Sequence, residues 1–282
     1  MWTGNPVPLR PAGSGVFTRI LRTPSIFPPT PMSRFVARTA VVLASFCVVS
    51  LSQAADLTVS AAASLTNAFK DIGTAYEVQN PGSKVLFNFA ASGVLLQQIA
   101  KGAPVDVFAS ADQETMDQAQ QQQLVKAGTR RNFVRNSLVV IVPVDGAAAP
   151  KSLQDLLPAK VEHIAIGVPA SVPVGRYTKG ALEKAQLWSQ VEPKMIGASS
   201  VRQVLDYVAR SEVDAGFVYL TDAAIMSDKV KVAFTVPTET PVLYPIAPIA
   251  SSPQSDEASK FISFVMSPSA QAILAKYGFA KP

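Results

Sequence analysis

Two strings of small residues decide the fold: Ala61-Ala62-Ala63-Ser64-Leu65-Thr66-Asn67-Ala68 and Ala90-Ala91-Ser92-Gly93. Each string follows a short apolar strand pattern and opens a helical pattern, with a serine at the junction. At such a junction the serine hydroxyl lies near the first backbone N–H groups of the helix, which have no partner inside the helix. The two strings therefore predict a site that holds a small anion, although an ordinary N-cap role would also explain either serine alone.

The same pattern continues along the chain as an alternation of strand-like and helical segments. Apolar residues at spacings of three and four, such as Leu65, Ala68 and Ile72, indicate helices between the strands. The alternation predicts right-handed βαβ units, an α/β fold and mostly parallel sheets, in which ligands bind where strand carboxyl ends meet helix amino ends. The strand-like runs are Leu57–Ala61, Lys84–Phe89, Val105–Ala109, Ser137–Val142, His163–Val168, Val213–Tyr219 and Val230–Thr235.

Three later segments place further hydrogen-bond donors at strand or helix ends. Pro173 suits the first turn of a helix, which leaves the N–H of Val174 free. Val201 follows two serines, one of which we expect to cap a helix, and its N–H is free for the same reason. Tyr219 ends an apolar strand, so its phenol faces the same edge of a sheet. Taken alone, these segments are equally well explained as a proline-bounded loop, a capped helix and a half-buried core tyrosine.

The basic charge of the chain is confined to its beginning. The formal net charge is +5, yet five arginines and no acidic residue precede residue 55, so the remaining 20 basic and 20 acidic residues cancel. Nucleic-acid binding is therefore not indicated. The positively charged start at Met32, the apolar run of residues 39–50 and the small residues near Ala54 predict a secretory leader over residues 32–54, cleaved after Ala54.

The part before this leader, residues 1–31, is interpreted as an over-extended start or a disordered segment. The apolar run of the leader is shorter than the ~20 residues that a membrane-spanning helix needs. Cys47, the only cysteine, lies in the leader after Phe46, where a lipoprotein signal requires a small residue. The mature chain is therefore expected to contain neither a disulfide nor a thiolate metal site.

As an ordered set, the segments from about residue 56 to 280 resemble the periplasmic molybdate-binding proteins, which are the solute receptors of ABC importers. Besides residues 61–68, the resemblance rests on Gly102–Phe108, Ser110–Gln113, Asn136–Val140, Val172–Tyr177, Val201-Arg202, Val218-Tyr219 and Tyr277–Phe279.

This resemblance implies a two-lobe periplasmic binding protein fold of type II, with the ligand in the interlobe cleft. We expect one lobe to contain residues 55–136 and 244–282, and the other to contain residues 137–243. The implied molybdate contacts are the hydroxyls of Ser64, Ser92 and Tyr219 and the N–H groups of Ser92, Val174 and Val201. Position 174 is Val where family members often have Ala, and Ser92 is the one hydroxyl available after Phe89.

The resemblance also implies a role. The chain would be a monomeric periplasmic receptor that delivers molybdate, and tungstate as well, to an inner-membrane ABC permease. It would need no cofactor and no catalytic residue, and molybdenum would be bound only as the oxyanion.

The donor types suit such a ligand. A fully ionised tetrahedral dianion has only acceptor oxygens, which N–H and O–H donors satisfy. Hydrogen phosphate would leave its proton unpaired, at a cost of ~1–3 kcal/mol. Sulfate must then be rejected by its smaller size, a filter that does not separate tungstate from molybdate. Arg176 and Arg202 flank the implied contacts, either as solvated charges or as groups that tune the field of the cleft.

Three alternatives remain open at this stage. The first is a hydrolase or transferase with Ser64 as nucleophile, which the single mature histidine, His163, and the absence of catalytic motifs disfavour. The second is a receptor of the same fold for sulfate or another small oxyanion. The third, the sensing domain of a transcription regulator, is disfavoured by the export leader. For Asp106, Asp112 and Asp222 we expect helix-capping roles.

Overall fold

The computed structural model describes residues 56–147 and 150–282. The predicted leader, its cleavage site after Ala54, the alternative start at Met32 and Cys47 all lie outside this part of the chain. Among the described residues, no helix is long and apolar enough to cross a membrane.

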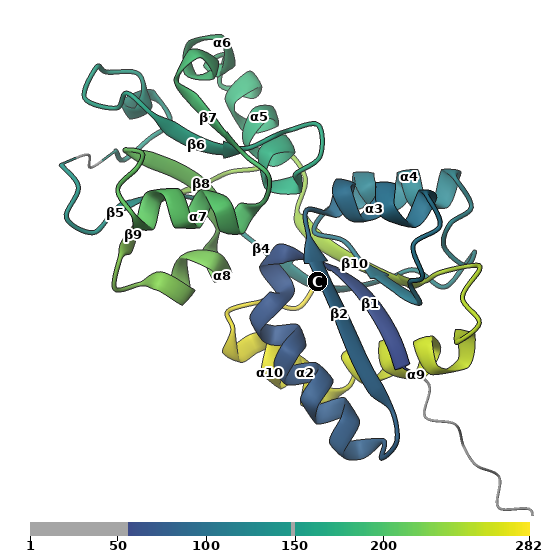
Figure 1. Cartoon of the computed structure of the whole chain (residues 1–282). Coiled ribbons are helices and arrows are strands. Elements are labelled where there is room, and N and C mark those ends of the chain that lie inside the picture. Colours follow the sequence, from purple (N-terminus) through teal and green to yellow (C-terminus); the bar gives the residue numbers. More distant parts are fainter. Residues whose placement is uncertain (1–55, 148–149) are drawn as a thin grey trace, which may run out of the picture. The chain divides into compact units, whose positions relative to one another are not determined.

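A first five-stranded sheet has the order β2-β1-β3-β10-β4 (Figure 1). Strands β2 and β3 run parallel to β1, whereas β10 runs antiparallel to both β3 and β4. We call this sheet and its helices the first lobe. Its elements are β1 (Asp56–Ala62), η1 (Ala63–Leu65), α2 (Thr66–Gln79), β2 (Lys84–Ala90), α3 (Ser92–Ala100), β3 (Val107–Ala109), α4 (Gln113–Gln121), β4 (Arg131–Asn136), β10 (Val242–Pro248), α9 (Ser255–Val265) and α10 (Pro268–Lys276).

A second five-stranded sheet has the order β7-β6-β8-β5-β9. Strands β7 and β8 run parallel to β6, whereas β8 and β9 run antiparallel to β5. This sheet and its helices form the second lobe. Its elements are β5 (Leu138–Pro143), η2 (Gln154–Leu156), β6 (Ile164–Gly167), α5 (Pro173–Lys184), α6 (Trp188–Val191), η3 (Glu192–Lys194), β7 (Met195–Ala198), α7 (Val201–Ala209), β8 (Ala215–Tyr219), α8 (Leu220–Ala223), η4 (Ala224–Met226) and β9 (Val230–Val236).

The predicted α/β fold with helix-flanked sheets is confirmed, but the sheets are mixed rather than mostly parallel. All seven expected strands are present, and three others were missed. Strands β4 and β7 lie at sheet edges, where little apolar surface is buried and the apolar pattern is weak. Strand β10 lies inside its sheet despite two prolines. The pairing register shifts at Pro245, which is the kind of irregularity that accommodates a proline within a sheet.

The chain passes between the two sheets twice. Strand β4 ends at Asn136 and β5 begins at Leu138, while β9 ends at Val236 and β10 begins at Val242. The lobe boundaries expected at residues 136/137 and 243/244 fall close to these two connections, the second of them two residues inside β10. As domain limits they stay a prediction.

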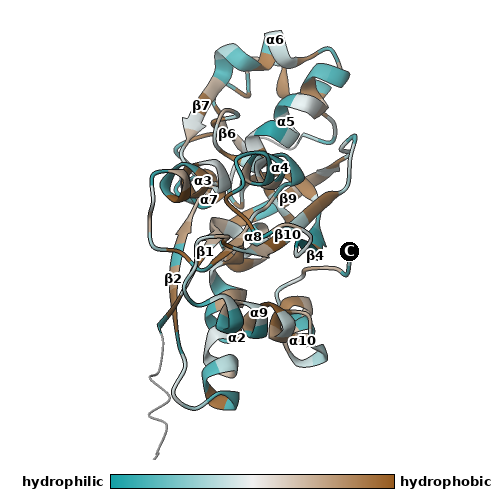
Figure 2. Cartoon of the chain, turned by 90° about the vertical axis from the view of Figure 1, so that its right-hand side faces the viewer, coloured by the Kyte–Doolittle hydropathy of each residue, from teal (hydrophilic) through white to brown (hydrophobic). Residues whose placement is uncertain are grey.

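Both faces of the first sheet are covered by helices. Phe108 of β3 packs with Leu95 of α3 and Met116 of α4 on one face. The neighbouring residue Val107 belongs to the larger core with Phe69 of α2 on the other face, because side chains alternate along a strand. Figure 2 shows the resulting contrast between the hydrophilic surface of α4 and the apolar colour of β10. The helical segments η1, α3, α5 and α7, which follow β1, β2, β6 and β7, begin where the two lobes meet, because their first residues line one cavity.

Candidate functional site

The five predicted site residues line one small cavity between the lobes. Each of the five is at most 4% exposed. The first lobe contributes Ser64 and Ser92, and the second contributes Val174, Val201 and Tyr219. The remaining lining residues, all of them apolar, are Ala62, Ala63, Ala90, Ala91, Ala111, Val172 and Pro173.

The two serines of the first lobe are not helix caps, although that explanation was open from the sequence. Ser64 lies in the short turn η1 before α2, whose N-cap is Leu65. Its hydroxyl lies 3.0 Å from the hydroxyl of Tyr244. Ser92 is the first residue of α3, and its hydroxyl accepts a hydrogen bond from the N–H of Ala111 at 3.0 Å. Both hydroxyls are therefore held by partners within the first lobe.

The second lobe contributes helix amino ends, as the sequence predicts. Pro173 occupies the first turn of α5, and Ser200 caps α7 by accepting the N–H of Gln203. Val174 and Val201 lie in these first turns, where N–H groups have no partner inside the helix. Neither N–H forms a hydrogen bond to another backbone group of the described chain.

The hydroxyl of Tyr219 is fully buried, and among the described residues it has no hydrogen-bond partner. Tyr219 ends β8 and lines the cavity. Burial raises the pKa of this phenol well above its usual value, so that it stays protonated and able to donate. A buried hydroxyl without a partner is costly, and an anion in the cavity would supply the missing acceptor.

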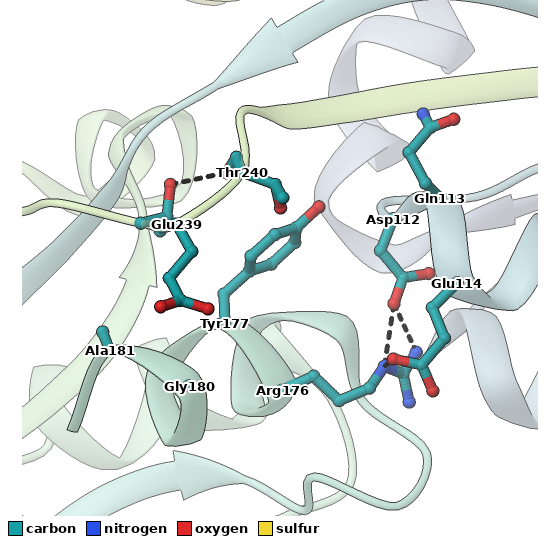
Figure 3. A pocket seen from close by; sticks show the side chains of 10 residues that line it. Asp112, Gln113, Glu114, Arg176, Tyr177, Gly180, Ala181, Glu239 and Thr240 are labelled. Carbon is teal, nitrogen blue, oxygen red and sulfur yellow. Dashed lines mark hydrogen bonds and ion pairs between the residues drawn. The ribbon is translucent and has the colours of Figure 1, made fainter. Parts of the chain in front are cut away.

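Among the described residues, no charged side chain lines the cavity, because the flanking arginines are engaged elsewhere. Arg176 of α5 donates to the carboxylate of Asp112 at 2.6 and 2.8 Å (Figure 3). Its guanidinium also donates to the hydroxyl of Thr115 at 2.6 Å. Arg202 of α7 donates to the carboxylate of Asp222 at 2.6 Å.

Both arginines also connect the lobes. Asp112 and Thr115 belong to the first lobe, and Arg202 reaches that lobe through the side chain of Asn67 at 2.8 Å and the carbonyl of Ser64 at 3.3 Å. The interpretation of these arginines as solvated charges is therefore wrong.

The expected acidic caps are only partly present. Asp112 caps α4 by accepting the N–H of Thr115. Asp106 instead accepts from the N–H of Thr58 in β1 and from the hydroxyl of Ser252 before α9, so it joins these two segments rather than capping a helix. Asp222 lies inside α8 and pairs with Arg202, and burial raises its pKa to about 6 while the guanidinium works in the opposite direction.

The two lobes touch directly beside the cavity. The N–H of Gly93 donates to the carbonyl of Ser171 at 3.0 Å. A Cβ at position 93 would meet that carbonyl oxygen at 2.7 Å and the Cα of Ser171 at 2.9 Å. A glycine at position 93 therefore permits this close approach of the two backbones.

Sequence reasoning missed two polar residues next to the site, Tyr244 and Asn136. The hydroxyl of Tyr244 accepts from the side-chain amide of Asn136 at 3.3 Å and contacts Ser64. Tyr244 lies in β10, a strand that the sequence pattern missed because it contains two prolines. Asn136 lies directly before Ser137, at the connection between the sheets. No local sequence pattern predicts that its side chain lies next to the site.

The enzyme alternative finds no support at the cavity. Catalysis by Ser64 would need a base, but no lysine or histidine lines this cavity among the described residues. His163 lies just before β6, where its backbone N–H donates to Asp214, in agreement with a structural role.

Comparisons with known proteins agree with this architecture. The sequence profile of the family described as "Bacterial extracellular solute-binding protein" matches residues 57–280. The molybdate-binding protein ModA of Escherichia coli is 37% identical over 239 residues, which cover 81% of this chain and 90% of that protein. A putative ABC transporter substrate-binding lipoprotein of Bacillus subtilis, YvgL, is 36% identical over 79% of this chain and 85% of its own length.

A solved structure is also similar. The substrate-binding domain of a putative molybdenum ABC transporter from Clostridium difficile has 36% sequence identity and a TM-score of 0.62, over 80% of this chain and 99% of that one. The predicted resemblance to molybdate-binding proteins and the two-lobe fold are thus confirmed, as is the expectation of a non-enzymatic transport component without a cofactor. The chain belongs to the family of bacterial extracellular solute-binding proteins.

Proposed function

We propose that this protein binds molybdate, and tungstate as well, in the interlobe cavity, and delivers the oxyanion to an ABC permease. Ser64, Ser92 and Tyr219 would bind through their hydroxyls, and Ser92, Val174 and Val201 through their N–H groups. The protein would act as a monomer in the periplasm, after removal of the predicted leader. The names of the relatives from E. coli and C. difficile support this choice of solute.

One observation carries the proposal: in the part of the chain that the structure describes, the cavity is lined by neutral hydrogen-bond donors and by no charged side chain. Three hydroxyls and the amino ends of α3, α5 and α7 meet there. Such donors suit an ion that has only acceptor oxygens, and the helix ends add partial positive charge. The unpartnered hydroxyl of Tyr219 supports the same conclusion, since it is left without an acceptor when no anion is present.

The donors also account for selectivity. Hydrogen phosphate brings a proton that needs an acceptor, and burying it unpaired costs ~1–3 kcal/mol. Sulfate has no such proton, but its oxygens lie closer to its centre. Hydrogen bonds from donors that are arranged for a larger ion would therefore be lengthened. Each charge-assisted bond lost in this way costs ~1.5–3 kcal/mol.

The test is isothermal titration of the purified protein with molybdate, tungstate, sulfate and phosphate. We expect tight one-to-one binding of the first two ions and far weaker binding of sulfate and phosphate. Sulfate bound as tightly as molybdate would favour the alternative, a receptor of the same fold for sulfate or another small oxyanion. If none of the four ions binds, the proposed solute class is wrong.

A further inference from the structure

We propose that Asn136 and Tyr244 are positioning residues that fix the direction of the Ser64 hydroxyl proton, so that Ser64 can only donate into the cavity. This inference deepens the proposed function and rests on it. It assigns the exclusion of protonated oxyanions to a chain of hydrogen bonds that begins outside the cavity.

The first step is the orientation of the Asn136 side chain. Its Oδ1 accepts the backbone N–H of Ser137 at 2.9 Å. A backbone N–H can only donate, so this contact identifies the oxygen and leaves the NH₂ group on the other side. That NH₂ group donates to the hydroxyls of Thr221 at 2.8 Å and of Tyr244 at 3.3 Å.

The second step follows from the chemistry of Tyr244. Its hydroxyl oxygen accepts from Asn136, and an NH₂ group cannot accept the phenolic proton in return. In the described part of the chain, the acceptor left within reach of that proton is the Ser64 hydroxyl at 3.0 Å. Tyr244 is 0% exposed, so water does not compete. Burial also raises the pKa of this phenol, which keeps the proton in place.

The third step concerns Ser64 itself. Because its oxygen accepts from Tyr244, its own proton must point elsewhere, and Ser64 lines the cavity. The chain therefore runs in one direction, from the Asn136 amide through the Tyr244 and Ser64 hydroxyls to the bound ion. A ligand proton facing Ser64 would meet another proton.

The second serine of the first lobe is oriented by the same principle with a different donor. The N–H of Ala111 donates to the Ser92 hydroxyl, so its proton is also directed away from the first lobe. The Ser92 donor is a backbone group, which only a proline at position 111 would remove. The Ser64 branch, with its two side-chain relays, can be changed without altering the backbone.

Asn136→Asp tests the direction of the chain. The carboxylate keeps the acceptor for Ser137 but replaces the NH₂ donor with a second acceptor, toward which Tyr244 and Thr221 would both donate. Tyr244 then no longer donates to Ser64, and the Ser64 proton turns toward Tyr244. We expect molybdate affinity to fall roughly 100-fold, part of it through repulsion between the new charge and the dianion.

A double-mutant cycle with Ser64→Ala separates these two causes. In Ser64→Ala, the charge introduced by Asn136→Asp still repels the dianion. The loss caused by reorienting the Ser64 proton is absent there, because the hydroxyl has been removed. In the Ser64→Ala background we therefore expect Asn136→Asp to cost only roughly 10-fold. An equal loss in both backgrounds would overturn the inference, because it would mean that Asn136 acts by charge or structure alone.

Tyr244→Phe is the second, uncharged test. It removes the relay and frees the Ser64 hydroxyl to rotate, so we expect molybdate affinity to fall roughly 3- to 10-fold and the ratio of molybdate to hydrogen phosphate affinity to fall as well. Tyr76→Phe is the matched control. Tyr76 is equally buried and its hydroxyl donates to Glu257 at 2.6 Å, away from the cavity.

The outcomes distinguish this inference from the proposed function. If the wild-type protein binds molybdate and Tyr244→Phe leaves the ratio of molybdate to hydrogen phosphate affinity unchanged, the inference is wrong and the proposed function stands. A wild-type protein that binds no oxyanion would overturn the proposed function and the inference with it. A reduced ratio in Tyr244→Phe, unchanged in Tyr76→Phe, together with non-additivity in the cycle, would support it.

Discussion

The two halves of the cavity differ in how their donors are held. In the first lobe, the Ser64 and Ser92 hydroxyls have protein partners before any ligand arrives. In the second lobe, the Tyr219 hydroxyl has no partner among the described residues, and the N–H groups of Val174 and Val201 form no hydrogen bond to their backbone. The two buried side-chain atoms without a partner in the described chain, on Tyr219 and Asp222, both belong to the second lobe.

This difference in how the donors are held indicates what an anion would contribute to each lobe. The first lobe presents donors already oriented by its own hydrogen bonds. The second lobe has polar groups that an anion between the lobes would satisfy. An ion would therefore favour the form in which the lobes meet, because only that form adds the second set of donors. The pairs formed by Arg176 and Arg202 and the contact of Gly93 with Ser171 hold that form together.

The largest effect that we expect concerns Asp222 of the second lobe, whose carboxylate atom Oδ2 has no hydrogen-bond partner among the described residues. Burial raises its folded-state pKa to about 6, above the usual 3.8. The folded protein therefore binds an extra proton between these values, and the resulting stability is fully present below about pH 4 and lost as the pH rises through 6. Relative to Asp222→Asn, the unfolding free energy of the wild type should fall by on the order of 3 kcal/mol between pH 4 and 7.

Urea unfolding at several pH values measures this difference, and Asp155→Asn provides a control of opposite sign. The pKa of Asp155 is lowered, chiefly by a hydrogen bond from the backbone of Lys151, so its contribution is present at higher pH and lost as the pH falls. A difference between wild type and Asp222→Asn that does not change with pH would contradict the picture of a costly buried carboxylate.

Next in size is Ser92→Ala, which removes an oriented donor of the first lobe. We expect molybdate affinity to fall by about 2 kcal/mol, or roughly 30-fold, through loss of a charge-assisted hydrogen bond. The unfolding free energy should also fall, by about 1–2 kcal/mol, because the N–H of Ala111 loses its acceptor. Titration and urea unfolding measure the two effects.

Ser83→Ala is the matched control for this variant, since its hydroxyl donates to Glu257 at 2.6 Å, away from the cavity. It should lower stability and leave affinity unchanged. If Ser92→Ala bound molybdate as tightly as the wild type, Ser92 would have to be removed from the site.

The smallest effect is expected for Tyr219→Phe, which removes an unpartnered donor of the second lobe. Affinity should fall roughly tenfold, as for one hydrogen bond to an anion. Here the unfolding free energy of the ligand-free protein should rise, by about 1 kcal/mol, because a buried hydroxyl without a partner disappears. The unfolding free energy is thus expected to rise in Tyr219→Phe and to fall in Ser92→Ala, which distinguishes the donors of the second lobe from those of the first.

Thermal or urea unfolding of the ligand-free Tyr219→Phe protein checks the sign. A loss of stability would show that the Tyr219 hydroxyl already has a partner, and the contrast between the lobes would then be wrong. Tyr76→Phe, which loses a real hydrogen bond to Glu257, should be destabilised in the same experiment.

Local patterns predicted much of this protein. Apolar runs located the seven strands that carry most of the core, and proline and serine positions located the amino ends of α5 and α7, because capping and periodicity depend on residues only a few positions apart. The same patterns missed β10, since prolines normally mark the end of a strand and only the register shift at Pro245 accommodates one here.

By itself, the sequence indicated the α/β architecture and the amino ends of α5 and α7, and its resemblance to a known family implied five of the residues that line the cavity. Only the tertiary structure decided the partners of these residues. Tyr244 reaches Ser64 across 180 positions of sequence, and Asp112 meets Arg176 across 64. Such pairs depend on the order of strands in two sheets and on contact between the lobes, which leave no local pattern. For this reason the direction of the hydroxyl protons and the pairing of the arginines could be inferred only from the tertiary structure.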